Sequence, residues 1–452
     1  MGIVRVQREL ALWTRRRLPG TAFAVYDPRH RAFRRISPRH LDAFLTGQAS
    51  LNAWAMPDPT GRRPRRSARI PTPLYAALQA RRTALRILER LRLAPDRPRV
   101  SRFADRLQRR LITPRYHAAM LNPDGTRRAH ITPDLAFAEP IEFAPSDVLV
   151  CAGFGWSHGD IAAIATAKAS SGFRLAVLCY DLIPLVFPEL FKPHDVTAMR
   201  EYWKTALPAA DVIVVNSHAV AGDVRRYCSA ERLSLERLIV RPLGSDPASL
   251  RAGVITSLPA TLEAGRYVLL VSTIEPRKGH EMLYRIWLDL LAEGVPQAHG
   301  FKLVFVGRPG WDTERLEQAL RTDERIARSL FILSDVSDAD LDSLYRGAAF
   351  CLYPSLYEGY GLPVVEAFSR GKAVISSNGG ALTEVVGRFS PALPPRDEGA
   401  WRETLRLWIE DPSARAPYEA AIRDDFSPLS WDAAAAGFFE GVAAALGATW
   451  RS

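Results

Sequence analysis

Long apolar runs and paired cysteines are both missing from this sequence. No apolar stretch approaches the roughly 20 residues that a membrane-spanning helix needs. The start, MGIVRVQREL, has no secretory apolar core. Only four cysteines occur in 452 residues, and none form a CxxC pair. This spacing argues against a disulfide framework or a cysteine-based metal site, and it favours free thiols in a cytoplasmic protein.

Lysine is absent from residues 61–117, which hold 17 arginines and only three acidic residues, in a chain with a net charge of +11. The stretch is consistent with a solvated basic face. It also suits peripheral contact with an anionic membrane, at roughly 1 kcal/mol per basic side chain near the lipid. We do not expect a nucleic-acid partner, because no recognition motif or aromatic–basic interleaving accompanies the charge.

A chain of 452 residues is too long for one hydrophobic core and predicts two domains. From residue 147 onward, apolar strands alternate with helices in two successive series, which is typical of parallel sheets covered on both faces. The predicted strands are 147–153, 174–180 and 212–216 in the first series, then 267–272, 302–307, 330–333, 349–354 and 372–376 in the second. The predicted helices are 158–170, 195–206, one from 218, 280–292, 312–321, 338–347 and 362–370.

The fold class predicted is therefore α/β, with two Rossmann-like, doubly wound domains. We place the first domain at 1–242, with an Arg-rich helical insertion at about 50–117, and a linker at 243–265. The second domain covers 266–430, and 431–452 holds a C-terminal helix that packs back across the linker.

Two glutamates, Glu358 and Glu366, flank a turn with the sequence GYGLP. Its glycines permit close approach of the backbone to a ligand, and its proline suits the first turn of a helix. Carboxylates here can accept hydrogen bonds from vicinal hydroxyls while amides at the helix start bind phosphate. The alternative is that both glutamates only favour the helix dipole, each by about 0.3–1 kcal/mol.

Two adjacent cations, Arg277 and Lys278, follow the predicted strand 267–272 in the segment EPRKG. They supply counter-charge for a diphosphate. Cations at a helix start oppose the dipole, so a merely structural role explains them poorly.

Together these elements resemble the retaining glycosyltransferases of family 4, which have the GT-B fold. The resemblance is strongest over 267–386, through EGYGLPVVE, EPRKG, VGRPGW and DVSDADLDSLYRGA. It is weaker in the first domain, through YDLIPLVFPELF and VVNSHAVAGDV. The sequence is most similar to bacterial enzymes that build O-antigen or exopolysaccharide, often mannosyl-, rhamnosyl- or fucosyltransferases.

The resemblance implies a nucleotide diphosphate sugar as donor, a GDP- or dTDP-sugar being favoured, with no cofactor and no metal. Arg277 and Lys278 would hold the diphosphate, and Lys278 would stabilise its departure. Glu358 would contact hydroxyls of the transferred sugar, and Glu366 would hold the ribose. The rest of the implied donor site consists of Gly359, the phosphate-binding amides of Tyr360, Gly361 and Leu362, and Ser334 and Val336 along the base.

In the first domain, Asp181 is the catalytic candidate beside Glu358 and Lys278; its alternative role is to cap backbone amides before Pro184. Tyr180 stands where the family often has histidine, so its contact with the sugar is in question. The family's usual Gly-Arg is replaced by Val271-Ser272, and Arg277 is the substitute cation.

GIVRVQREL resembles the glycine turn and first helix of the family, without the strand that normally precedes them. Either the natural start lies upstream, or the chain has been cut, or the first sheet lacks a strand. Gly2 would border the acceptor side.

Asp338-Ala339-Asp340 spells the D-x-D of metal-dependent sugar transfer, but Ser337 with Asp340 predicts a helix cap instead.

The sequence thus predicts an enzyme that is a retaining, metal-independent hexosyltransferase. The acceptor would be a glycan or polyprenyl-linked glycan, reached in the cytoplasm or at the inner face of the plasma membrane. An epimerase or phosphorylase of the same fold is disfavoured by the pairing of EPRKG with the two glutamates. A rival of another class is a degenerate, non-catalytic GT-B scaffold or partner subunit.

Overall fold

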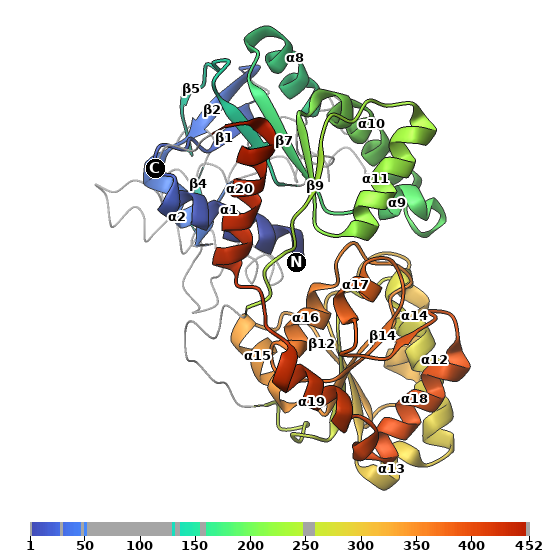
Figure 1. Cartoon of the computed structure of the whole chain (residues 1–452). Helices are drawn as coiled ribbons and strands as arrows, with labels where there is room; N and C mark the ends of the chain where they lie inside the picture. The colour runs from blue at the N-terminus through green and yellow to red at the C-terminus, as the bar shows by residue number, and fades with distance from the viewer. Residues whose placement is uncertain are drawn as a thin grey trace, which may run out of the picture. The chain divides into compact units, whose positions relative to one another are not determined.

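The computed structural model describes residues 2–27, 30–46, 49–51, 129–131, 136–153, 160–246 and 258–448 (Figure 1). The Arg-rich stretch 61–117 lies outside these ranges, as do residues 247–257 of the predicted linker. The chain forms two compact units, one of Gly20–Glu142 and one of the remainder. The unit Gly20–Glu142 therefore extends beyond both ends of the insertion that was predicted at about 50–117. None of the helices in the described ranges is long and apolar enough to span a membrane.

The described part of the unit 20–142 holds a small antiparallel sheet with strand order β1-β2-β5. Its elements are β1 (Ala24–Asp27), β2 (Ala32–Ile36), α2 (Pro38–Leu45), β3 (Ala49–Leu51), β4 (Ala129–Ile131) and β5 (Phe137–Pro140). β3 and β4 pair with each other in parallel.

The larger unit contains two parallel sheets, and the first has the order β6-β7-β8-β9 among the described strands. Its strands are β6 (Val148–Cys151), β7 (Arg174–Cys179), β8 (Val212–Val215) and β9 (Leu238–Val240). The associated helices are α1 (Gly2–Arg17), α8 (Ile161–Ser171), α9 (Ile183–Val186), α10 (Pro193–Ala209), α11 (His218–Glu231) and α20 (Trp431–Leu446), with a 3-10 turn η2 (Pro188–Leu190). The first three predicted strands are confirmed, and β9, three residues long, was not predicted.

Side chains along β7 alternate between two hydrophobic cores. Leu175 and Val177 pack among residues of α8, α10 and α11, whereas Ala176 and Leu178 pack among residues of α1 and α20. The sheet is therefore covered on both faces, with α20 beside α1 (Figure 1). The C-terminal helix, predicted to pack back across the linker, thus lies on the first sheet.

The second sheet is also parallel, with the order β12-β11-β10-β13-β14-β15. Its strands are β10 (Tyr267–Val271), β11 (Lys302–Val306), β12 (Leu330–Leu333), β13 (Phe350–Tyr353), β14 (Val374–Ser377) and β15 (Ala392–Leu393). Its helices are α12 (His280–Ala292), α13 (Val295–His299), α14 (Glu314–Thr322), α15 (Asp338–Gly347), α16 (Leu362–Phe368), α17 (Leu382–Val386), α18 (Glu398–Glu410) and α19 (Ala416–Asp425), with 3-10 turns η4 (Pro276–Lys278) and η5 (Pro412–Ala414).

The strand order of this sheet reverses at β10. The chain runs outward through β11 and β12, then returns to place β13 on the other side of β10. Ligands of open α/β sheets bind at the carboxyl ends of strands on either side of such a switch point. The segments that follow β10 and β13 are EPRKG and EGYGLP, so the topology brings the two predicted motifs together.

All four cysteines are free, which confirms that prediction: Cys179, Cys228 and Cys351 are buried, and Cys151 is half-buried.

Candidate functional site

The segments after β10 and β13 pack directly on each other. Leu356 donates its backbone N–H to the carbonyl of Arg277 at 2.7 Å. Gly279 ends η4 with φ +74°, and a Cβ there would lie 2.8 Å from the carbonyl oxygen of Pro354. Only glycine fits both that backbone conformation and that approach.

This packing buries an ion cluster centred on Glu358. Arg277 Nη1 lies 3.0 Å from Glu358 Oε1, and Lys278 Nζ donates to the same oxygen. Lys278 Nζ also donates to Tyr353 Oη at 3.2 Å. Both Lys278 and Glu358 are about 7% exposed. The three residues that the resemblance assigns to the diphosphate and the sugar thus form one ion cluster, with Arg277 half-buried and the other two buried.

Glu275 joins this cluster through its Oε1, which lies 2.7 Å from Arg277 Nε. Burial raises the pKa of Glu275. Burial alone would also raise the pKa of Glu358, but Arg277 and Lys278 outweigh it and hold that pKa at about 2. Burial, with Arg277, lowers the pKa of Lys278. Glu358 is therefore the carboxylate that stays ionised between the two cations.

Asp181 lies directly after β7 and against the glycine turn. A Cβ added to Gly359 would be 2.8 Å from Asp181 Cβ and 2.5 Å from the carbonyl oxygen of Tyr180. Asp181 Oδ1 accepts the backbone N–H of Ile183 at 3.1 Å, so the capping role is present. Burial raises the pKa of Asp181, against an opposing effect of Arg277. The side chain therefore has both a capping partner and a place beside the ion cluster.

Tyr180 uses its hydroxyl within the first domain. Its Oη donates to the carbonyl of Ala152 at 2.7 Å, and Asn216 Nδ2 donates to its backbone carbonyl at 3.0 Å. A phenol has one proton to donate. In this arrangement Tyr180 can meet a sugar hydroxyl only as an acceptor.

Glu366 lies one turn inside α16 and is held from two directions. Arg5 of α1 donates through Nη1 to Glu366 Oε1, and Tyr345 Oη donates to Glu366 Oε2 at 3.3 Å. Sequence reasoning identified Glu366 but neither of these partners. No sequence signal connects Arg5 with a carboxylate 361 residues later.

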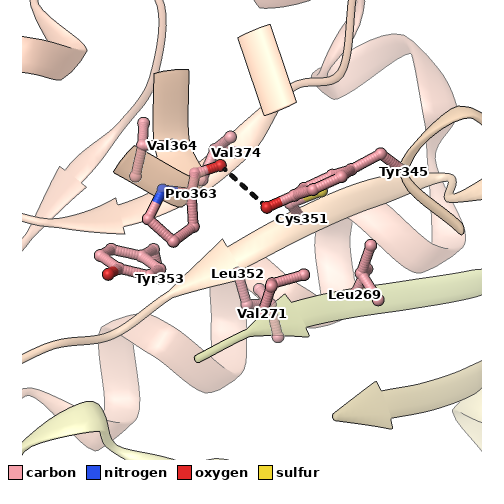
Figure 2. A pocket seen from close by; sticks show the side chains of 9 residues that line it. All are labelled: Leu269, Val271, Tyr345, Cys351, Leu352, Tyr353, Pro363, Val364 and Val374. Atoms are coloured by element: carbon pink, nitrogen blue, oxygen red, sulfur yellow. Dashed lines mark hydrogen bonds between the residues drawn. The ribbon is translucent and has the colours of Figure 1, made fainter. Parts of the chain in front are cut away.

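A small cavity lies at the start of α16, lined by Pro363 and Val364 of that helix and by residues of neighbouring strands. Figure 2 shows Tyr345 reaching toward Pro363, whose carbonyl oxygen lies 3.4 Å from Tyr345 Oη. The cavity measures about 10 Å³, enough for about one water molecule. It is too small for a nucleotide or a sugar, so it is not the donor site.

The other predicted donor residues lie around the same sheet edge. Gly361 begins α16 with φ +100°, where only glycine is unstrained. Tyr360 Oη donates to the carbonyl of Leu243 at 3.0 Å. Leu362 is the first residue of α16, and a Cβ on Gly2, at the start of α1, would lie 3.4 Å from its Cδ1. The phosphate role of these amides and the acceptor role of Gly2 remain predictions.

The two residues predicted to lie along the base follow β12. Ser334 is exposed and donates to the carbonyl of Gly307 at 3.1 Å, and Val336 is partly buried against the core of the second sheet. Their contact with a base stays a prediction.

The D-x-D sequence forms a helix cap, as predicted. Ser337 Oγ accepts the backbone N–H of Asp340 at 3.1 Å and donates to Asp340 Oδ2 at 2.6 Å. Within the described ranges, no group of three or more His, Cys, Asp or Glu side chains is placed to hold a metal ion.

Residues 260–425, which contain both motifs, match the family described as glycosyl transferases group 1. The O-antigen chain mannosyltransferase B of Escherichia coli is 34% identical over 265 residues, which cover 57% of this chain and 67% of that protein. The chain belongs to the glycosyl transferases of group 1. The recognised resemblance to bacterial O-antigen glycosyltransferases is thereby confirmed.

A longer relative is the serotype-specific mannosyltransferase WbdA of Escherichia coli, 26% identical over 306 residues. These residues cover 64% of this chain and 37% of that protein, so the chain spans little more than a third of the WbdA relative.

Solved structures agree on the fold of this group 1 glycosyl transferase. An α,α-trehalose-phosphate synthase from Burkholderia xenovorans aligns with a TM-score of 0.52 at 17% identity, over 66% of this chain and 73% of that one. A sucrose-phosphate synthase from Thermosynechococcus elongatus aligns with a TM-score of 0.50 at 20% identity, over 67% and 74%. The predicted GT-B fold is confirmed.

Proposed function

We propose that this chain is a retaining hexosyltransferase of surface polysaccharide biosynthesis. It takes a hexose from a nucleotide diphosphate sugar and transfers it to a glycan or a polyprenyl-linked glycan. Mannose is the first candidate sugar, ahead of rhamnose and fucose, because the relatives named above are mannosyltransferases. GDP-mannose is accordingly the first donor to test.

The observation that carries this proposal is the placement of Arg277 and Lys278 on one oxygen of Glu358, at the switch point of the second sheet. The slow part of sugar transfer is the build-up of negative charge on the departing diphosphate. Preorganised cations in a water-poor site stabilise that charge most effectively. Glu358, ionised beside them, supplies an acceptor for hydroxyls of the transferred sugar.

The cluster combines two cations with three carboxyl groups, on Asp181, Glu275 and Glu358. Burial raises the pKa of Asp181 and of Glu275, whereas Arg277 and Lys278 outweigh burial and hold the pKa of Glu358 at about 2. Glu358 is also the carboxylate that both cations contact.

The reaction can proceed without a general-base carboxylate. The acceptor hydroxyl forms a bond to the anomeric carbon from the side of the leaving group, while the bond from that carbon to the phosphate oxygen breaks. The proton of the hydroxyl passes to the departing phosphate, so atoms and charges balance and the anomeric configuration is kept. Arg277 and Lys278 take the charge-stabilising role that a metal ion fills in other transferases.

A thermal-shift screen tests the donor. The set is GDP-mannose, GDP-fucose, dTDP-rhamnose, UDP-glucose and UDP-N-acetylglucosamine, on the wild type and on Glu366→Ala. At about 100 times its dissociation constant a true donor adds about 2.7 kcal/mol of stability. We expect a shift with one donor that Glu366→Ala loses. Glu398→Ala is the matched control, because Glu398 pairs with Arg285 on the surface.

The absence of any shift would support the non-catalytic alternative. If no donor stabilises the folded wild type, the chain is better described as a non-catalytic GT-B scaffold or partner subunit. If a donor still stabilises the Glu366→Ala variant, the protein binds nucleotide sugars, but Glu366 does not hold the ribose.

The proposed lipid-linked acceptor follows from the net positive charge of the chain. A basic chain suits a polyanionic lipid carrier at an anionic membrane face, in the cytoplasm. Sedimentation with vesicles of neutral lipid and of lipid containing phosphatidylglycerol tests this; equal binding to both would remove the membrane part of the proposal.

A further inference from the structure

Arg5 is a candidate ligand contact that the sequence did not suggest. It lies in the first turns of α1, and its Nη1 donates to Glu366 Oε1 in α16. Its guanidinium also lies over the ring of Trp431 in α20, 5.7 Å from the ring centroid. The side chain of Arg5 is 22% exposed and that of Glu366 is 9% exposed.

This ion pair is not needed to hold α1 in place. Val6 and Leu10 of the same helix are buried in the core of the first sheet, and Trp13 stacks on Phe439 at 5.1 Å. A partly buried ion pair contributes little net stability, because desolvation of both charges offsets their attraction. The position of Arg5 therefore calls for another explanation.

The pair lies next to the predicted diphosphate site. Gly2 packs against Leu362, so the start of α1 lies beside the start of α16. One turn further along each helix, Arg5 meets Glu366. In a nucleoside diphosphate the ribose carries the first phosphate on its own C5′ oxygen. A cation that rests on the ribose carboxylate is therefore within side-chain reach of that phosphate.

A further cation could add to the binding of the diphosphate by the second domain. In the second domain, Arg277 is already paired with Glu275 and Glu358. We propose that Arg5 is a donor-binding residue supplied by α1. It neutralises Glu366 in the ligand-free protein, and it contacts the phosphate nearest the ribose once ribose hydroxyls occupy Glu366. This rests on the proposed function and adds a residue to it.

Two other roles for Arg5 make different predictions. If Arg5 only orients Glu366, its loss weakens binding of a nucleoside and of a nucleoside diphosphate to the same degree. If Arg5 blocks Glu366, its loss strengthens binding of both. Only a phosphate contact makes the effect depend on the phosphates.

The test measures GDP by calorimetry and guanosine by ligand-observed NMR, with UDP and uridine or dTDP and thymidine as the next pairs. We expect Arg5→Ala to weaken GDP binding about ten- to hundredfold, the usual effect of losing a hydrogen bond between charged groups. Guanosine binding should change less than about threefold, and Arg5→Lys should fall between wild type and Arg5→Ala for GDP. Arg16→Ala, which removes the pair of Arg16 with Asp432 from the same helix, should bind like wild type.

Equal losses for GDP and guanosine in Arg5→Ala, or gains for both, would overturn the inference while leaving the proposed function intact. If the wild type binds none of the three diphosphates, the proposed function fails and this inference with it. Should Arg5→Ala not fold, Arg5→Met keeps a long unbranched side chain at this position and carries the same test.

Discussion

Glu384 of α17 accepts the backbone N–H groups of His218 and Ala219, the first two residues of α11, at 2.8 and 2.6 Å. Ser217 Oγ accepts the next amide, that of Val220, at 3.2 Å. A helix start leaves amides without partners inside the helix, and a carboxylate there also meets the positive end of the dipole. Glu384 thereby ties the helix that follows β8 to the sheet that binds the donor in our proposal.

Glu384→Ala should lower the free energy of unfolding by about 1–2 kcal/mol, the range for loss of a helix cap. Urea unfolding followed by circular dichroism measures it. Glu281→Ala is the control, because Glu281 is exposed and lies 3.6 Å from Arg285 on the same helix. It should change stability by less than about 0.5 kcal/mol. Equal stability of the two variants would mean that Glu384 contributes nothing as a cap.

Lys278→Met should reduce both stability and turnover. Removing one partner of a buried ion pair costs about 3 kcal/mol even here, where Arg277 still contacts Glu358. Turnover of the donor found in the screen, measured as release of its nucleoside diphosphate, should fall about 10²–10³-fold.

The double variant Lys278→Met/Glu358→Gln separates these two effects. It should regain much of the lost stability, because no carboxylate charge is left short of a cation, while its turnover stays low. A double variant that is no more stable than Lys278→Met would contradict the ion-pair account, and full turnover in either variant would contradict the leaving-group role.

The burial of His280 predicts that the folded protein loses stability in acid. It is buried, its Nε2 lies 3.3 Å from Ser272 Oγ, and burial together with Lys278 lowers its pKa to about 3. An unfolded histidine has a pKa near 6.5, so between pH 6.5 and about 3 the unfolded state binds more protons. The stability contributed by neutral His280 is complete above pH 6.5 and is lost as the pH falls toward 3.

His280→Phe removes this titration. Between pH 7.5 and 4.5, the wild type should lose about 3 kcal/mol more stability than His280→Phe, as measured by urea unfolding at both pH values. His194→Phe, at an exposed histidine, controls for the substitution itself. If wild type and His280→Phe respond to acid alike, His280 does not stay neutral in the folded protein.

Gly359→Ala should destabilise the contact between the glycine turn and the segment after β7. Its Cβ would come within 2.5 Å of the carbonyl oxygen of Tyr180, and Ser217 Oγ donates to the Gly359 carbonyl at 2.8 Å. Overpacking of this kind costs about 1–3 kcal/mol, and turnover should fall because Asp181 is displaced from the ion cluster. Gly437→Ala in α20, where nothing beyond the helix's own backbone lies within 4 Å of the added Cβ, should instead stabilise by about 0.5–1 kcal/mol. Unchanged stability in Gly359→Ala would show that the two segments separate freely.

Much of the fold was predictable because it depends on local pattern. The helices 280–292 and 338–347 were predicted to the residue. Apolar spacing indicates both of them, and the cap at Ser337 indicates the start of the second. β9 and α13 were not predicted, because three and five residues are too few to display a period.

The sequence by itself determined that three charged residues of the second domain meet at one edge of its sheet. Arg277, Lys278 and Glu358 follow apolar strands, and parallel strands bring their carboxyl ends to one sheet edge, so their meeting follows from the chain order. Only the tertiary structure decided the partners that come from elsewhere, such as Arg5 for Glu366 and the start of α11 for Glu384. These contacts join segments more than 160 residues apart, and their existence depends on how whole sheets and helices pack, which no local pattern encodes.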